Sequence, residues 1–417
     1  MTIAAAFLVV SLAAWRGASV AKPFNRVHVV WQVDFKHAFG IVLQDVSPSG
    51  VMLTFDWYRA KAGSSRPPLN LWSVGETAPS TVINLPEWPA YKGELPPIGI
   101  DCKFTADGDR IVCAHGPWLA LIDIQTKKEI QCVLGTRGFF GLKLTGADVD
   151  KMPSLTVLAV DSKDGRVAVA YNTLKNPQIL VFSRDLRTRV GGWKALKYVQ
   201  GLFWSRDGKR LGVLYHNTYE PLYNQRGKWT NRNPEVALAG VPDVSIFDVS
   251  SGKELLSFAT DGFEAKAAFS RDGKLIYVIA HSRVFWEYAR GSDWTKDTLR
   301  AFSSTTGKLV RTFKVRSTGV RNNFAVSPDG NFIVAGCTKD AHSPLYYNLL
   351  TLLTMREVLS DDINAGFVIL DASSGRVTFR KTQRMVGAVG IPLPLFFSAK
   401  GGLLIANFGA ISRSVAG

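Results

Sequence analysis

The sequence predicts an all-β fold, a seven-bladed β-propeller of four-stranded antiparallel blades, on three observations. A short turn motif containing glycine recurs along the chain, a strand–turn–strand segment follows most of its copies, and both ends of the chain have the composition of strands. Repeated units of this kind stack into one continuous core, so a chain of 417 residues need not divide into several domains. We therefore expect residues 22–417 to form a single propeller domain.

The recurring motif consists of an apolar residue, a small polar residue, two variable residues and glycine. Its seven copies are Val46–Gly50, Phe104–Gly108, Asp161–Gly165, Trp204–Gly208, Phe269–Gly273, Val326–Gly330 and Phe397–Gly401. The polar residues favour a tight turn, and glycine adopts positive φ without steric cost. The segments on either side of each turn are nearly all apolar, which predicts two inner strands that are covered on both faces.

The second motif supplies two more strands to each unit. It is an alternating strand, a turn such as Ser-Gly-Lys and another strand, and it occurs at Leu119–Ile130, Val244–Phe258, Leu299–Phe313 and Phe367–Phe379. Four antiparallel strands make a propeller blade. The alternation of the two turn types resembles the WD-repeat-like and YVTN-type β-propellers from Phe24 to the C-terminus, and this resemblance implies a binding platform. The Trp-Asp dipeptide is absent, with Phe247-Asp248 its nearest form.

The two ends of the chain are expected to share the closing blade. After the last turn, residues 403–407 and 411–415 can supply a second and a third strand. The segment Arg26–Val33 precedes the first inner strand and is expected to be the missing outer strand. Pairing of N- and C-terminal strands would then close the ring and remove its free sheet edges.

The N-terminal segment carries a twelve-residue apolar run, Ile3–Ala14. It is too short to span a bilayer as a helix, and small residues at 19–21 suit signal peptidase, so residues 1–21 are expected to be a signal peptide or export anchor. The alternative is a packed segment ahead of the first strand, because no Lys or Arg precedes the run. Export to the periplasm or the extracellular space is expected, with a cytoplasmic location as the alternative.

The cysteines allow one disulfide. Cys102 and Cys113 flank a predicted hairpin turn at similar distances, so a bridge between them is conceivable, although two buried thiols are the favoured interpretation. No Cys-x-x-Cys pair or Cys/His spacing typical of zinc occurs, so no metal and no cofactor is predicted.

Four long insertions, at residues 57–68, 216–242, 281–296 and 337–365, fall between the second and third strands of their blades and should emerge on one face. Binding sites commonly lie on loops that a rigid scaffold holds, and Trp, Tyr and Arg are enriched in interfaces. The candidate binding residues on this face are Trp57, Tyr58, Arg59, His115, His216, Tyr219, Tyr223, Trp229, His281, Trp286, Tyr288, Trp294, Tyr346 and Tyr347. The alternative for each aromatic residue is packing of the loop onto the propeller. Leucine spacing in residues 346–359 also predicts a short helical insertion in blade six.

Two further observations bear on metal binding and catalysis. His115, His216 and His281 each end the second strand of a blade, where they could bind a metal or act as acid and base, but capping by backbone is favoured. The sequence has no nucleophile elbow, zinc-protease motif, P-loop or dinucleotide fingerprint, so no catalytic residue is assigned.

The predicted function is therefore non-enzymatic binding of a protein or glycan partner by a monomer. A net charge of +16 favours an acidic partner, and its spread along the chain does not favour a nucleic-acid site. Two alternatives stay open: a channel-face enzyme of hydrolase, lyase or lactonase type, and a binder of polyanions such as nucleic acid or anionic membrane.

Overall fold

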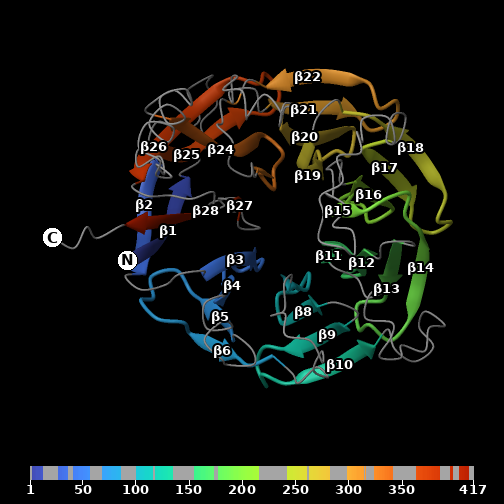
Figure 1. Ribbon diagram of the computed structural model, residues 1–417, viewed down its shortest axis with the longest axis horizontal. Coiled ribbons are helices and arrows are strands. Elements are labelled where there is room, and N and C mark those ends of the chain that lie inside the picture. The colour runs from blue at the N-terminus through green and yellow to red at the C-terminus, as the bar shows by residue number, and fades with distance from the viewer. Residues whose placement is uncertain are drawn as a thin grey trace, which may run out of the picture.

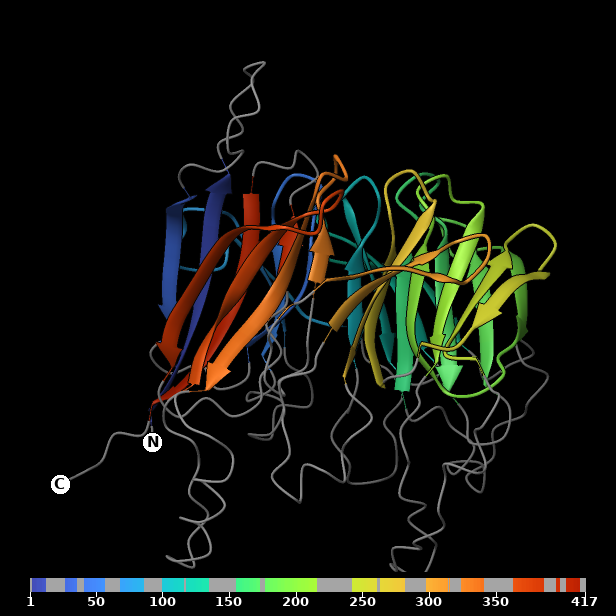
Figure 2. The ribbon, with the colours of Figure 1, turned by 90° about the horizontal axis from the view of Figure 1, so that it is seen from above.

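The computed structural model describes residues 2–12, 27–35, 41–56, 68–85, 100–115, 118–134, 155–172, 177–215, 242–260, 263–281, 298–313, 315, 324–340, 363–385, 395–397 and 403–412. Every regular element in these ranges is a β-strand, and none is a helix. The strands form four-stranded antiparallel sheets arranged around a central axis, which is the architecture of a β-propeller (Figure 1). Figure 2 shows the ring edge-on, with the strands running between its two sides.

Six blades are each built from four consecutive strands. The first three contain β3 (Ile41–Val46), β4 (Met52–Asp56), β5 (Leu69–Trp72) and β6 (Thr81–Ile83); β7 (Asp101–Phe104), β8 (Arg110–His115), β9 (Trp118–Asp123) and β10 (Glu129–Leu134); and β11 (Leu155–Val160), β12 (Val167–Asn172), β13 (Gln178–Phe182) and β14 (Arg189–Lys194). The next three contain β15 (Val199–Trp204), β16 (Arg210–Tyr215), β17 (Val244–Asp248) and β18 (Glu254–Phe258); β19 (Phe263–Phe269), β20 (Leu275–His281), β21 (Thr298–Ser303) and β22 (Leu309–Phe313); and β23 (Phe324–Val326), β24 (Phe332–Asp340), β25 (Ile363–Asp371) and β26 (Val377–Met385).

One further four-stranded sheet joins the two ends of the chain. Its order is β2-β1-β28-β27, formed by β1 (Thr2–Leu12), β2 (Val27–Phe35), β27 (Leu395–Phe397) and β28 (Leu403–Ser412). Strand β1 lies between β2 and β28 and pairs antiparallel with both. The innermost strands β23, β27 and β3 contact in that order, so this sheet lies between the last and the first of the six blades.

This topology corrects the predicted fold. Only six blades are continuous repeats, not seven, and the remaining sheet is a composite. The predicted pairing of Arg26–Val33 with a C-terminal strand is wrong, because β2 pairs only with β1 in the described sheet. The apolar run near the N-terminus forms β1, and residues 403–412 form one strand instead of two. The predicted helix in blade six is not among the described elements, and residues 346–359 lie outside the described ranges.

The hairpin between the first and second strands of a blade is held by a Ser–Asp pair. In the β15–β16 turn, the Ser205 hydroxyl donates to Asp207 Oδ1 at 2.6 Å, and the Lys209 backbone N–H donates to the same oxygen at 3.1 Å. Gly208 completes the turn at φ 69°, in the left-handed region where glycine alone is unstrained. Ser270 with Asp272 and Ser327 with Asp329 repeat the arrangement, so the turn motif in the sequence has a direct structural cause.

The core lies between neighbouring blades. One cluster combines Ala168 and Val181 of the β11–β14 blade with Leu211 and Val213 of the β15–β18 blade, and all four side chains are fully buried. Burial of each large aliphatic side chain contributes about 1.5 to 3 kcal/mol. Within a blade, the solvent exposure of the residues increases from the inner strands to the outermost strand. Every residue of β12 is buried, whereas β14 is largely exposed.

Candidate functional site

The second and third strands of each blade are joined on the side of the ring opposite the Ser–Asp turns. In four blades this connection is long: it leaves after β4, β16, β20 and β24 and returns at β5, β17, β21 and β25. We call these eight strand ends the insertion rim. The β8–β9 and β12–β13 connections are short by comparison, since His115 pairs directly with Trp118. The strands therefore place the starts and ends of all four long connections on one side of the propeller.

Among the connections that the strands define, the one from β16 to β17 is the longest, and we call it the longest insertion; the residues at its two ends are buried. The Tyr215 backbone N–H donates to the Asp243 carbonyl at 2.9 Å, which joins the residue directly before the insertion to the residue directly after it. Lys197 Nζ lies 3.7 Å from Asp243 Oδ1, and the two side chains are only 11% and 1% exposed. Asp243 Oδ2 also accepts a hydrogen bond from the Thr260 backbone N–H at 2.7 Å. This carboxylate thus connects the two ends of the β17–β18 hairpin.

A second buried contact lies on the same side of the ring, next to the insertion rim, at the end of β12. The Asn172 side-chain amide at the end of β12 donates to the Val199 carbonyl and accepts from the Val199 N–H, both at 2.7 Å. Two hydrogen bonds from one amide lock the orientation of that amide and connect two blades. The rim around the longest insertion is therefore rigid where the structure describes it.

Most of the predicted binding residues lie outside the described ranges, and their assignment stays a prediction. These are Trp57, Tyr58, Arg59, His216, Tyr219, Tyr223, Trp229, Trp286, Tyr288, Trp294, Tyr346 and Tyr347. The backbone of the two remaining residues is described: His115 ends β8 opposite Trp118, and His281 ends β20 opposite Phe263. The two histidines belong to blades that are separated by two others, so no histidine cluster follows from the strand positions.

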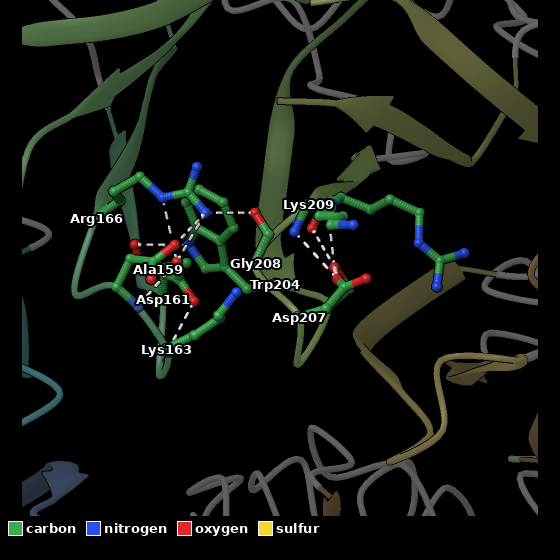
Figure 3. A network of polar contacts seen from close by, with 11 residues as sticks. Ala159, Asp161, Lys163, Arg166, Trp204, Asp207, Gly208 and Lys209 are labelled. Carbon is green, nitrogen blue, oxygen red and sulfur yellow. Dashed lines mark hydrogen bonds and ion pairs between the residues drawn. The ribbon is translucent and has the colours of Figure 1, made fainter. Parts of the chain in front are cut away.

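The opposite side of the ring, where the Ser–Asp turns lie, is closed by arginine bridges between blades (Figure 3). Arg166 Nη2 lies 3.0 Å from the fully buried Asp161 carboxylate and donates to the Gly208 carbonyl of the next blade at 2.5 Å. The guanidinium group also lies 5.1 Å from the centroid of the Trp204 ring. The Trp204 indole N–H in turn donates to the Ala159 carbonyl at 3.2 Å. These contacts tie the two turns together and occupy their polar groups.

The next pair of blades carries a similar bridge. Arg210 Nη2 donates to the Gly273 carbonyl at 2.8 Å, and its guanidinium group lies 5.0 Å from the Phe269 ring centroid. The Ser304 hydroxyl donates to the same carbonyl at 2.7 Å. We interpret the arginine side of the propeller as a structural surface, because its side chains hold neighbouring blades together.

Four of the charged residues on innermost strands form what we call the central cluster: Asp45 on β3, Asp101 and Lys103 on β7, and Lys266 on β19. Lys103 Nζ donates to the Gln44 carbonyl at 2.8 Å and lies 3.5 Å from Asp101 Oδ1. The Lys103 and Asp101 side chains remain 27% and 24% exposed, so solvent reaches this cluster. Charges that lie this deep in a fold interact more strongly than charges at the surface.

The two carboxylates of the cluster also join inner strands. Asp45 Oδ2 accepts a hydrogen bond from the Phe104 backbone N–H at 2.8 Å, and Asp101 Oδ2 accepts one from the Leu158 N–H at 2.9 Å. Each carboxylate thus bonds to the first strand of the following blade. Burial raises the pKa of Asp45, and the Lys103 charge and the Phe104 hydrogen bond partly offset this effect.

The lysines of the cluster differ in their environment. Burial alone would lower the pKa of Lys103, but the Asp101 and Asp45 carboxylates outweigh it and the pKa is raised. Burial and the positive charge of Lys103 lower the pKa of Lys266 to about 7, against a smaller opposing effect of Asp45. Lys266 Nζ also lies 5.9 Å from the centroid of the Phe324 ring. The two lysines therefore differ in the direction in which their surroundings shift the pKa.

Sequence reasoning missed this cluster. A signal was present, since Asp101, Lys103 and Lys266 stand in short, otherwise apolar segments just before a glycine turn. A charge in an inner strand is costly to bury and commonly marks a structural or functional contact. The sequence could not show that strands β3 and β7 bring Asp45, Asp101 and Lys103 together, because the two strands belong to different blades.

The described residues contain no group of three or more His, Cys, Asp or Glu side chains placed to hold a metal ion. No helix long and apolar enough to cross a membrane occurs in the part of the chain that the structure describes.

Comparison with known proteins assigns no family to the chain. No protein-family model matches the chain, so the WD-repeat-like and YVTN-type assignment rests on resemblance alone. No curated protein matches either. One solved structure with a similar fold is Kuenenia stuttgartiensis hydrazine synthase, with 15% sequence identity, a TM-score of 0.48, and coverage of 75% of this chain and 74% of that one. Similarity at this level carries no information on function.

Proposed function

We propose that this chain is a non-enzymatic binding propeller that holds an acidic protein partner against its insertion rim. The observation that carries the proposal is the buried base of the longest insertion, formed by Lys197, Asp243 and the Tyr215–Asp243 backbone bond. A rigid base lowers the entropic cost of presenting a loop to a partner. The insertions supply Trp, Tyr and Arg, which are the residue types enriched in binding hot spots.

The charge of the chain supports the acidic character of the partner. A net charge of +16 raises the rate of encounter with anionic surfaces. The buried bridge between Cys102 and Cys113 supports export to an oxidising compartment, where disulfides persist. Both features are compatible with a partner outside the cytoplasm.

The test compares a triple variant, Trp229→Ala, Trp286→Ala and Trp294→Ala, with a control variant, Leu309→Ala and Val310→Ala. The control residues are apolar side chains on the outer strand β22 that are 54% and 57% exposed. Partners are captured by affinity purification with cross-linking, and binding of the identified partner is then measured with purified components.

The proposal expects the triple variant to lose binding by about a hundredfold, equivalent to about 2.7 kcal/mol, while the control binds normally. Cross-links should map to the four insertions. Loss of capture after enzymatic removal of glycans would identify a glycan partner and overturn the protein assignment. Cross-links confined to the arginine side, or equal binding by both variants, would overturn the proposed site.

A further inference from the structure

We propose that the outer edge of β26 (Val377–Met385) binds an extended acidic peptide segment, which adds to its blade as a fifth strand. The blade is the sheet β23-β24-β25-β26, and β26 is its outermost strand, on the outside of the ring (Figure 1). This edge is separate from the insertion rim, which consists of strand ends. The inference therefore goes beyond the proposed function, and its test uses no partner of the insertions.

The length of this edge is the first argument. The outer strands of the other five continuous blades have three to six residues, whereas β26 has nine and pairs with β25 from Val377 to Met385. The described sheet contains no strand on the other side of β26, so its outward N–H and C=O groups form an edge of roughly 30 Å. An unpaired edge is a template for another strand, and natural proteins commonly keep such edges short. This long edge is therefore a place where a strand can be added.

The charge of the edge is the second argument, and it indicates an acidic partner. From residue 376 to residue 384 the chain has no Asp or Glu and carries four basic residues: Arg376, Arg380, Lys381 and Arg384. Arg376 and Arg380 are exposed, and among the described residues neither forms an ion pair with a carboxylate. The outer strands β10 and β18, by contrast, each contain a glutamate. The edge of β26 thus complements negative charge.

The spacing of the arginines fits an extended partner. Arg380 lies opposite Val368 and Arg384 lies opposite Asn364 on β25, so the two arginines have positions on the same side of the sheet. A strand added next to β26 has the same alternation, so acidic residues at every second position would lie on that side. Carboxylates bind guanidinium groups through charge-assisted hydrogen bonds, while the two backbones pair. Nucleic acid and lipid have no strand backbone, so the edge favours a peptide.

The blade formed by β19 to β22 holds the start of β26 in place. The Arg311 guanidinium group on β22 donates to the Ser373 carbonyl in the turn that precedes β26. The Asp371 carboxylate accepts from the Ser373 hydroxyl in the same turn at 2.7 Å. Further along the strand, the centroid of the Phe379 ring lies 6.0 Å from that of the fully buried Phe367 ring on β25. A preformed edge lowers the entropic cost of binding an extended segment.

The probe is a fluorescein-labelled peptide, Thr-Glu-Val-Glu-Val-Glu-Thr, which is titrated into the full-length protein and followed by fluorescence anisotropy. One control peptide has Lys in place of each Glu. The other keeps the glutamates but is N-methylated at each Glu and Val, which removes the strand hydrogen bonds without changing the charge. We expect saturable binding of the acidic peptide that weakens as the salt concentration rises, and binding of both controls that is weaker by about tenfold or more.

Hydrogen–deuterium exchange locates the bound peptide, which should slow the exchange of backbone amides in residues 377–385. Arg380→Glu should weaken binding by about tenfold or more, because it reverses a charge at the edge. Lys253→Glu is the matched control, since it makes the same change at an exposed residue of another blade, where screening limits its effect. Arg380→Gln removes the charge without reversing it, so it should weaken binding less and covers the case in which Arg380→Glu does not fold.

The proposal is overturned if the acidic peptide does not bind, or if the N-methylated peptide binds equally well, which would reduce the interaction to a general attraction of anions. It is also overturned if Lys253→Glu weakens binding as much as Arg380→Glu does, or if the peptide slows exchange only outside residues 377–385. Self-association of Arg380→Gln, with no binding of the peptide to the wild type, would show that the basic residues only protect the edge from pairing.

Discussion

Lys197 and Asp243 form an ion pair with a 3.7 Å N–O separation beneath the longest insertion, and both side chains are nearly excluded from solvent. The pair lies where the chain returns from residues 216–242 into β17. Asp243 additionally accepts a hydrogen bond from the Thr260 backbone N–H, so a single carboxylate connects Lys197, the start of β17 and the segment that follows β18. This ion pair, which we call the Lys197–Asp243 clamp, therefore stabilises the fold and supports the side of the propeller that we propose as the binding side.

The first prediction concerns this clamp. Asp243→Ala should lower the free energy of unfolding by about 3 to 5 kcal/mol, because it leaves a buried lysine without its carboxylate partner. Lys197→Met keeps the volume of the side chain and should cost less. Urea unfolding of both single variants and of the double variant measures the coupling. Additive effects in the double variant would show that the two side chains act independently.

The second prediction separates backbone strain from steric conflict at two glycines. Gly208 has φ 69°, and a Cβ there would lie 2.6 Å from Arg166 Nη2 and 2.7 Å from Asp161 Oδ2. Gly75 has φ 96° with nothing near its Cβ position. Gly75→Ala should cost about 1 to 2 kcal/mol from backbone conformation alone. Gly208→Ala should cost about 1 to 3 kcal/mol more because it disrupts the arginine bridge. Equal decreases in melting temperature for Gly75→Ala and Gly208→Ala would contradict the predicted steric contribution at Gly208.

The third prediction concerns the disulfide. Cys102 and Cys113 are directly opposite on β7 and β8, both fully buried, with Cα atoms 4.2 Å apart. Reduction, or the double change Cys102→Ala and Cys113→Ala, should lower stability by about 2 to 4 kcal/mol. Differential scanning calorimetry with and without reductant measures the effect. Cys132→Ala is the control, because Cys132 is a free cysteine whose pKa burial raises to about 11. A wild-type protein insensitive to reductant would contradict the prediction.

The fourth prediction is acid destabilisation through the turn aspartates. The Ser205 hydroxyl and the Lys209 N–H lower the pKa of Asp207, despite opposing desolvation, and hydrogen bonds from Ser250 and Ser251 lower that of Asp248 to about 2. A carboxyl group with a depressed pKa in the folded state stabilises the protein above the unfolded pKa. That stability is lost as the pH falls from about 4 to about 2.

The acid prediction is tested by unfolding experiments across this pH range. Asp207→Asn keeps an oxygen that can accept from Ser205 but cannot ionise, so its stability should fall less steeply between about pH 4 and about pH 2. Asp109→Asn, on another turn, is the comparison. Identical pH profiles for the wild type and Asp207→Asn would show that this carboxylate does not contribute.

The fifth prediction concerns the N-terminal strand. Removal of residues 1–12 deletes β1, which pairs with both β2 and β28, and leaves two unpaired sheet edges. The truncated protein should melt at a lower temperature and aggregate, because exposed edges template association. Removal of residues 413–417, which follow β28, is the control. A truncated protein as stable as the full chain would indicate that residues 1–12 can be removed as a signal peptide without loss of the propeller.

The sequence alone determined the repeating elements of this protein. The Ser-x-Asp-Gly pattern has a local cause, since Ser205, Asp207 and Gly208 form their turn through contacts between near neighbours in the chain. The apolar strands on either side of each turn also predicted the blades, because they too are a local feature of the sequence. Local turn chemistry and strand periodicity can be recognised without knowledge of the whole fold.

Only the tertiary structure decided how the ends and the charges are arranged. An apolar run such as residues 3–14 suits a signal peptide or a buried strand equally well, and its pairing with β28, nearly four hundred residues away, distinguishes the strand. The Lys197–Asp243 ion pair and the hydrogen bond from the Phe104 N–H to Asp45 likewise join segments that are distant in the sequence. Such contacts depend on ring closure, which brings inner strands together irrespective of their separation in the sequence, so no local pattern could reveal them.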